Sequence, residues 1–158
     1  MLYCVNYFGL ELSVYVKDDM ILKTSFSQNC KGIKNSGFQR DFEKFVCGER
    51  NVLNFTLGNI DDRLRKVYLK AIEIPYGFVS SYGDISLSIF GNKKYSRFVG
   101  YAMSVNHLPI IVPCHRVVSS NGSIGGFSSP IEIKLKLLGI EKVKVVNGKI
   151  GKAFFAHI

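Results

Sequence analysis

Apolar and polar residues alternate at the start of the chain, a period of two that is typical of β-strands. The alternating apolar positions are Leu2, Cys4, Leu10, Leu12, Val14 and Val16. A polar turn, Lys17-Asp18-Asp19, comes next, and a second apolar run, MILKTSF, follows it. The pattern therefore predicts a strand over the first run, a tight turn and a second strand, which together form a β-hairpin.

The period then changes to that of an α-helix. In the stretch FQRDFEKFVCG, three phenylalanines and a valine recur at helical spacing, and Gly48 ends the pattern. Residues 49–60 show no clear period and predict a connector. We expect residues 1–55 to form a small N-terminal domain of β-hairpin and helix.

Helical patterns dominate the second part of the chain, residues 56–158. The stretch DDRLRKVYLKAIEI carries an apolar stripe and stops before Pro75. A brief helix is predicted over residues 84–90, closed by Gly91, and another begins at about Ser96. Two short helices joined by a tight glycine-containing turn predict a helix-turn-helix.

The second helix of this pair has two distinct faces, because residues three and four apart lie on the same side. The face expected to be available for contact holds Arg97, Gly100, Tyr101 and Ser104. The face expected in the core holds Phe98, Ala102 and Val105.

Beyond this helix, an apolar run surrounds the sequence PCHRVV and ends at the turn SSNG. A loop, GGFSSP, then leads into a short amphipathic helix, IEIKLKLLGIE, and the remaining tail has a β-like pattern. The whole chain is therefore expected to have an α+β fold, with a small N-terminal domain and a mainly helical C-terminal one.

Positive charge gathers in the second part. Residues 1–60 hold 7 Lys or Arg against 6 Asp or Glu, whereas residues 61–158 hold 14 against 6, within a total net charge of +9. A concentrated basic region favours phosphate-bearing partners such as nucleic acid. A solubilising surface rich in lysine explains the charge equally well.

The four cysteines are scattered, with no CxxC pair and no histidines at zinc-ligand spacing, so we expect no metal site. Pairing of Cys30 with Cys47 would suit an extreme thermophile, but buried free thiols are the expectation for an ordinary cytosol. No apolar run approaches the roughly 20 residues that span a bilayer, and the first residues lack a basic leader. We expect a cytoplasmic protein with no membrane contact.

Cys114 and His115 are adjacent in sequence, and a thiol next to an imidazole is a candidate nucleophile. Neighbouring side chains of an extended segment face opposite sides, so a water would have to bridge them. Glu141 is the candidate carboxylate behind the histidine, where it would fix the tautomer. Without further support, the adjacency of the two residues is more often a structural accident than a catalytic pair.

Several stretches together resemble the alkylguanine-DNA alkyltransferases, also called methylated-DNA-protein-cysteine methyltransferases. They are YGFVSSYGDIS, SRFVGYAMSVNHLPIIVPCHRVV, NGSIGGFS and LLGIE, within residues 64–142. The resemblance implies transfer of an alkyl group from the 6-oxygen of guanine in duplex DNA to Cys114. It also implies a single turnover, no cofactor and a monomer. For the N-terminal domain it implies RNase H-like character, on position and size alone.

The resemblance also assigns individual roles. It makes Cys114 the nucleophile, His115 the base that acts through water and Glu141 the residue that orients it. Arg97 is expected to fill the space left by a flipped base, and Tyr82 to contact the purine and protonate the leaving guanine. The remaining expected roles are a hinge for Asn106, backbone contacts to the base for Val117 and Ser128, a pocket wall for Phe127, and a structural role for Arg116.

This sequence departs from the family pattern near the DNA-facing helix and its hinge. His107 stands where a proline commonly follows the hinge asparagine, and Phe98 and Tyr101 stand where small residues are usual. Three other readings remain: a module that binds alkylated bases without chemistry, a transcriptional regulator that uses the helix pair, and a cysteine hydrolase. The first would not need Cys114, the second needs polar base-reading side chains, and the third needs an oxyanion hole.

Overall fold

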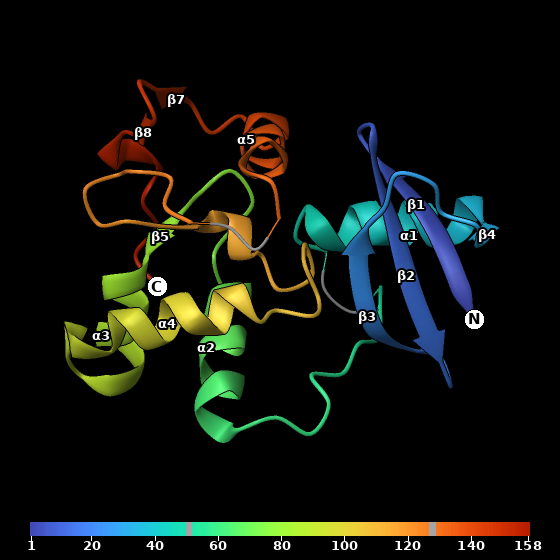
Figure 1. Ribbon diagram of the computed structural model, residues 1–158, viewed down its shortest axis with the longest axis horizontal. Helices are drawn as coiled ribbons and strands as arrows, with labels where there is room; N and C mark the ends of the chain where they lie inside the picture. Colours follow the sequence, from blue (N-terminus) through green and yellow to red (C-terminus); the bar gives the residue numbers. More distant parts are fainter. Residues whose placement is uncertain (50–51, 127–128) are drawn as a thin grey trace. The chain divides into compact units, whose positions relative to one another are not determined.

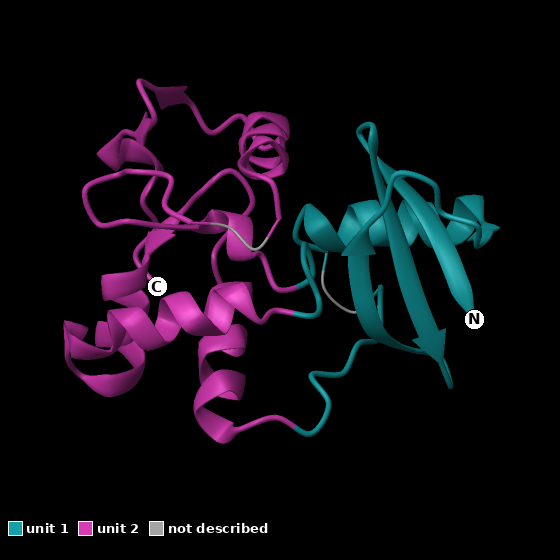
Figure 2. Cartoon of the chain, viewed as in Figure 1, with its two compact units in different colours: residues 1–59, 107–111 teal, residues 60–106, 112–158 magenta. Residues whose placement is uncertain are grey.

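The computed structural model describes residues 1–49, 52–126 and 129–158. The chain divides into two compact units, residues 1–59 with 107–111 and residues 60–106 with 112–158 (Figure 2). The division between the units falls four residues beyond the predicted boundary at residue 55. The return of residues 107–111 to the first unit was not predicted.

The first unit is a four-stranded sheet and a helix (Figure 1). Its elements are β1 (Leu2–Tyr7), β2 (Leu10–Lys17), β3 (Met20–Phe26), β4 (Ile33–Lys34) and α1 (Ser36–Val46). The strand order is β3-β2-β1-β4, with antiparallel pairs except for β1 and β4, which are parallel. Alternate residues of β2 point into the core, where the ring of Phe42 from α1 meets that of Tyr7 edge-on at 6.5 Å.

The predicted first strand is in fact two strands, because the chain turns at Phe8 and Gly9. Both residues have positive φ, 49° and 79°, and β1 then pairs with β2 from Tyr7↔Leu10 to Leu2↔Tyr15. A phenylalanine seldom adopts the left-handed conformation, so its presence hid the turn in the sequence.

The cysteines of this unit also differ from expectation. Cys4 and Cys30 form a disulfide bond, and Cys47 is an exposed free thiol. The prediction of buried free thiols was therefore wrong for these three residues, as was the alternative pairing of Cys30 with Cys47. The parallel pairing of β4 beside β1, with Cys4 opposite Lys34, brings the segment that holds Cys30 back to β1.

The second unit is mainly helical. Its elements in chain order are α2 (Asp62–Ile72), β5 (Ser80–Ser81), α3 (Tyr82–Phe90), η1 (Lys93–Tyr95), α4 (Ser96–Ser104), η2 (Cys114–Arg116), β6 (Val117–Val118), α5 (Ile131–Ile140), β7 (Val145–Val146), β8 (Lys149–Ile150) and η3 (Lys152–Phe154). Strands β5 and β6 pair in parallel, and β7 and β8 form a hairpin. The predicted mixed α+β fold, an N-terminal sheet followed by several helices, is confirmed.

Local sequence sets the helix ends in this unit. The side chain of Asp61 accepts a hydrogen bond from the Arg63 amide at 2.9 Å and caps α2. Ser81 caps α3 by accepting from the Asp84 amide at 3.0 Å. Gly91 ends α3 in the left-handed conformation, as the sequence predicted. Among the described residues, none of the helices is long and apolar enough to cross a bilayer.

Candidate active site

The end of α4 and the start of η2 are held together by one side chain. Nδ2 of Asn106 donates a hydrogen bond to the carbonyl of Val112 at 2.9 Å, and the amide of Cys114 donates to the same carbonyl at 2.8 Å. The chain leaves the second unit after Asn106 and returns at Val112. The asparagine thus joins the two ends of the segment 107–111, which belongs to the first unit, and fixes the position of Cys114.

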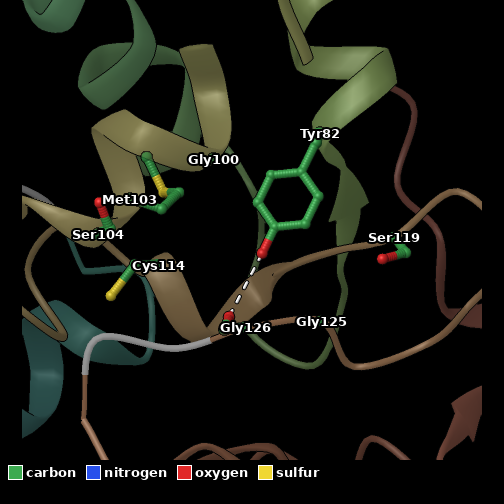
Figure 3. Close-up of a pocket in the computed structure, with 8 residues that line it drawn as sticks. All are labelled: Tyr82, Gly100, Met103, Ser104, Cys114, Ser119, Gly125 and Gly126. Carbon is green, nitrogen blue, oxygen red and sulfur yellow. Dashed lines mark hydrogen bonds between the residues drawn. The ribbon is translucent and has the colours of Figure 1, made fainter. Parts of the chain in front are cut away.

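Cys114 lines a pocket of about 380 Å³ within the second unit (Figure 3). The other lining residues are Tyr82, Gly100, Met103, Ser104, Ser119, Gly125 and Gly126. They come from α3, α4, η2 and the loop that follows β6, so four segments converge on the thiol. The volume falls in the range of small-molecule sites.

Tyr82 forms one side of this pocket together with Gly125 and Gly126, which belong to the loop after β6 that we call the glycine loop. The hydroxyl of Tyr82 donates to the carbonyl of Gly126 at 3.4 Å, the dashed contact in Figure 3. Gly125 has a φ of +75°, and a Cβ there would lie 3.1 Å from the Tyr82 hydroxyl. Burial, with a smaller contribution from Cys114, raises the pKa of Tyr82, so its hydroxyl stays protonated at neutral pH.

The thiol of Cys114 is buried, and this burial raises its pKa. Smaller effects act in the opposite direction: a hydrogen bond with the Asn106 side chain, the charge of Lys134 and the backbone amides of Cys114 and His115. The site therefore keeps the thiol neutral at rest but holds groups that favour the thiolate. A base is needed to ionise it.

His115 and Glu141 form a fully buried pair. Nε2 of His115 donates to Oε1 of Glu141 at 2.7 Å, and burial lowers the pKa of the imidazole despite the opposing carboxylate. With the proton on Nε2, the neutral ring presents Nδ1 as an acceptor. Nδ1 is buried and has no hydrogen-bond partner among the described residues. The pair thus presents a neutral base with a fixed tautomer.

Arg116 completes the surroundings of Glu141. Its Nε donates to Oε2 at 2.9 Å, its Nη2 donates to Oε1 at 2.9 Å, and the amide of Gly77 donates to Oε2 at 3.1 Å. Burial alone would raise the pKa of Glu141, but the hydrogen bonds and charges of His115 and Arg116 outweigh it and lower the pKa to about 2. The carboxylate is therefore ionised and fully bonded, so it is suited to orienting His115 rather than to carrying a proton.

The contact face predicted for α4 is largely at the surface. Arg97, Tyr101 and Ser104 are exposed, whereas Gly100 is half-buried against the pocket. The predicted core face was wrong at Val105, which is 43% exposed.

The buried residues of α4 are Val99, Ala102 and Met103. Phe98, which was predicted to lie in the core, is only half-buried. The buried face of α4 thus shares only Ala102 with the predicted face.

Three predicted base-contacting residues remain. Val117 is fully buried in β6 and is not among the residues that line the pocket. Phe127 and Ser128 lie outside the described residues. Among the described residues, His, Cys, Asp and Glu side chains form no group of three that could hold a metal ion.

The part of the chain that holds this site matches a known protein family. A family profile described as "6-O-methylguanine DNA methyltransferase, DNA binding domain" matches residues 62–143, just over half of the chain, including all of α2 to α5. The chain belongs to this family. The matched span holds Cys114, His115, Glu141 and Arg97 as well as every described residue that lines the pocket.

Relatives within the 6-O-methylguanine DNA methyltransferase family match different shares of the chain. A methylated-DNA--protein-cysteine methyltransferase of Methanosarcina acetivorans is 41% identical over 103 residues, 65% of this chain and 65% of its own length. A second, from Methanosarcina mazei, is 33% identical over 139 residues, 85% of each chain. This chain thus matches just under two thirds of the first relative and most of the second.

Solved structures similar to this family member include complexes with DNA. OGT of Mycobacterium tuberculosis in complex with DNA has a TM-score of 0.73 at 26% identity, over 89% of this chain and 92% of that one. An S. pombe protein in complex with damaged DNA containing O6-carboxymethylguanine has a TM-score of 0.56 at 33% identity, over 62% of this chain and 97% of that one. The first likeness spans both units.

Sequence reasoning missed several residues of the site in this methyltransferase family member. They are the pocket-lining Met103, Ser119, Gly125 and Gly126, and Lys134. Lys134, on α5, is fully buried, and its Nζ donates to the carbonyl of Val117 at 2.8 Å. Burial lowers its pKa to about 8, and the charge of Cys114 opposes that change. The stretch IEIKLKLLGIE alternates Lys with apolar residues, so nothing in it distinguished the buried Lys134 from the exposed Lys136.

Proposed function

We propose that this protein repairs DNA by transferring an alkyl group, typically methyl, from the 6-oxygen of guanine to the sulfur of Cys114. The observation that carries the proposal is a buried thiol in a pocket of about 380 Å³, beside a buried histidine whose tautomer a carboxylate fixes. The names of the relatives, methylated-DNA--protein-cysteine methyltransferases, support it.

In the proposed reaction His115 acts as the base. Nδ1 accepts the thiol proton through a bridging water, and Glu141 stabilises the imidazolium that results. The thiolate attacks the alkyl carbon, so an S–C bond forms as the C–O bond breaks and its electron pair stays on the guanine. Tyr82, protonated at neutral pH, donates a proton to that leaving guanine. The thioether is stable, so each molecule reacts once and needs no cofactor.

Lys134 and Asn106 support the thiolate in this proposal. The charge of Lys134 and the hydrogen bond from Asn106 both lower the pKa of Cys114, against the larger effect of burial. Arg116 has a structural role: besides Glu141, it binds the carbonyl of Ile74 through Nη1 at 2.9 Å. Val117 and Ser128 stay as predicted backbone contacts to the base, and Phe127 as a predicted wall.

Double-stranded DNA is the proposed substrate, and α3 with α4 is the proposed helix-turn-helix. The two helices pack against each other and against η1, and α4 carries the exposed Arg97 and, three positions further on, the pocket-lining Gly100. The alkylated base would leave the stack for the pocket, at a cost of a few kcal/mol. Arg97 would occupy the space that it leaves, and Tyr101 and Ser104 would face the groove.

The remaining proposals concern the whole protein. We keep residues 1–55 and 56–158 as the proposed domains, the N-terminal one being RNase H-like, and a monomer as the active form. The antiparallel meander β1-β2-β3, the parallel strand β4 and the helix α1 support the N-terminal assignment.

Loss of 6-O-methylguanine from a synthetic duplex tests the proposal. The intact protein is expected to remove one lesion per molecule, and Cys114→Ala none, while the variant still binds the duplex. Arg97→Ala is expected to slow repair of the duplex but not reaction with the free base, because only the duplex requires extrusion. Binding of the lesion by the intact protein without its removal would overturn the proposal in favour of a binding module.

A further inference from the structure

The segment that leads to Cys114 is part of the first unit. Residues 107–111 belong to that unit, whereas Asn106 and Val112 on either side belong to the second. We call residues 107–111 the strap. Only Val112 and Pro113 separate it from Cys114. The position of the strap therefore determines where the chain enters η2.

The strap is bound at the edge of the N-terminal sheet. The strand order β3-β2-β1-β4 makes β3 an edge strand, and the outward N–H and C=O groups of such a strand need partners. The amide of Thr24 in β3 donates to the carbonyl of His107 at 3.0 Å, and Oγ1 of Thr24 donates to the carbonyl of Pro109 at 2.8 Å. A single buried residue, 2% exposed, thus binds the strap at two points.

The backbone of the strap has a conformation that its surroundings must maintain. Ile110 has a φ of +75°, in the left-handed region that a β-branched residue seldom adopts. A strained conformation persists only where the surrounding structure enforces it. The side chains of Leu108, Ile110 and Ile111 are buried, and the hydrogen bonds of Thr24 fix the backbone just before Ile110. The strap is therefore a strained segment that Thr24 stabilises.

Hydrogen bonds carry the position of the strap on to the thiol. The carbonyl of Val112, the first residue after the strap, accepts from Nδ2 of Asn106 at 2.9 Å and from the amide of Cys114 at 2.8 Å. A shift of the strap would move this carbonyl, because Val112 is bonded directly to Ile111. The amide of Cys114 would then lose its partner or follow it.

We propose that Thr24 is a positioning residue for the alkyl transfer: its two hydrogen bonds fix the strap, and the strap fixes the sulfur of Cys114 relative to the alkyl carbon. The inference rests on the proposed function. It gives a part in the reaction to the first unit, which supplies none of the pocket residues that the structure describes. A displacement of about 1 Å at the reacting atoms can slow a reaction about a hundredfold, so a loose strap is expected to slow the chemical step.

Single-turnover kinetics on a duplex that carries 6-O-methylguanine test the proposal. Thr24→Val removes the Oγ1 donor and keeps the amide. This variant is expected to lower the maximal rate about tenfold and to leave the half-saturating protein concentration unchanged, because DNA affinity does not depend on the strap. Thr24→Ser keeps the donor and is expected to retain the rate of the intact protein. An unchanged maximal rate in Thr24→Val would overturn the proposal.

Thr56 offers a matched control at the same edge of the sheet. Its amide donates to the carbonyl of Ile21 in β3 at 3.0 Å, and its Oγ1 accepts from the amide of Gly58 at 3.1 Å. Thr56→Val is expected to leave the maximal rate unchanged. Equal loss of rate in the two valine variants would show that Thr24 acts through stability alone and would overturn the proposal.

Melting temperatures verify that each variant is folded. Thr24→Ala takes the place of Thr24→Val if the valine variant does not fold, because alanine puts no methyl group against the carbonyl of Pro109. The same fall in maximal rate is expected for it, and an unchanged rate would equally overturn the proposal.

Hydrogen exchange at the amide of Cys114 tests the strap without any repair reaction. This amide is bonded to the carbonyl of Val112, so it is expected to exchange about tenfold faster in Thr24→Val and at the rate of the intact protein in Thr56→Val. Unchanged exchange in Thr24→Val would overturn the proposal. An intact protein that removes no lesion would instead refute the proposed function, and the exchange rates would still decide whether Thr24 fixes the strap.

Discussion

The imidazole of His115 determines how the proposed transfer depends on pH. Burial raises the pKa of Cys114 above its ordinary value of 9.0 and lowers that of His115 below 6.5. The neutral base is present above its folded-state pKa and is lost as pH falls through that value. We therefore expect the single-turnover rate to be level between pH 6.5 and 9.0 and to fall only in acid.

Replacement of the base changes this profile. His115→Gln is expected to slow transfer about a hundredfold or more and to make the rate rise with pH, because the variant depends on spontaneous ionisation of Cys114. Single-turnover rates on a methylated duplex, measured across this pH range, give the profile. If the rate of the variant were as level across this pH range as that of the intact protein, His115 would not be the base.

The buried ammonium of Lys134 is expected to stabilise the thiolate. Lys134→Met removes a charge that lowers the pKa of Cys114, so the thiol should react about fivefold more slowly with iodoacetamide at neutral pH, the effect of roughly 1 kcal/mol of lost charge interaction. Lys136→Met, on the exposed side of the same helix, is the control. Equal reactivity of both variants and the intact protein would show that Lys134 acts only in packing.

Among single residues, the sequence predicted those whose chemistry is visible in the residue type. A cysteine beside a histidine, with a glutamate at the end of a later helix, indicated a candidate nucleophile and its candidate partners, and the structure brings His115 and Glu141 into contact. It could not indicate Lys134, because lysine at a helical position is usually exposed and only the packing of α5 against η2 buries it.

At the scale of elements, the hairpin β7–β8 binds the turn that leads into the pocket-lining glycine loop. The amide of Ile150 donates to the carbonyl of Gly122 at 2.8 Å, in the turn between β6 and the glycine loop. Ile150 also packs into a core cluster with Val79, Val118, Leu138 and Val143. The tail, which the sequence indicated only as β-like, thus holds the turn that precedes Gly125.

Substitution at this contact tests the support. Gly122 has a φ of +83°, and a Cβ there would lie 2.4 Å from the Ile150 carbonyl oxygen, so Gly122→Ala is expected to destabilise the protein by about 3 kcal/mol. Gly148→Ala is the matched control, with a φ of +72° and nothing within 4 Å; it should cost only about 1 kcal/mol. Denaturant unfolding measures both, and equal losses would exclude a role for the hairpin contact.

Periodicity predicted most elements, and its failures have local causes. The helices α1, α2, α3 and α4 were placed from apolar spacing and from caps such as Gly91. The turn at Phe8 was missed because its conformation is unusual for phenylalanine. The exposure of Val105 was missed because spacing gives the angle between faces but not which face meets the core.

At the scale of the whole molecule, the disulfide of the first unit bears on stability. Cys4 and Cys30 are separated by 26 residues, and closure of such a loop stabilises a protein by about 3 kcal/mol. Reductant is therefore expected to lower the denaturant midpoint of the intact protein but not that of a variant with Cys4→Ser and Cys30→Ser. Thiol titration of the unfolded, unreduced protein should give two thiols, those of Cys47 and Cys114; four would contradict the disulfide.

Organisation at this scale was the hardest to predict. Return of residues 107–111 to the first unit depends on tertiary hydrogen bonds, such as that from the Thr24 amide to the His107 carbonyl at 3.0 Å. Likewise, the pairing of Cys4 with Cys30 depends on strand order, and connectivity of cysteines does not follow from their spacing. Both are properties of the assembled chain rather than of any segment.

The central claim is that the pocket, and not thiol chemistry in general, directs the alkyl group to one sulfur. Peptide mass spectrometry after reaction with a duplex carrying 6-O-methylguanine tests it most directly, because the exposed free thiol of Cys47 is an internal control. One methyl group on every peptide that contains Cys114, and none on Cys47, is the predicted result. Methyl on Cys47, or on neither cysteine while the lesion disappears, would contradict the account.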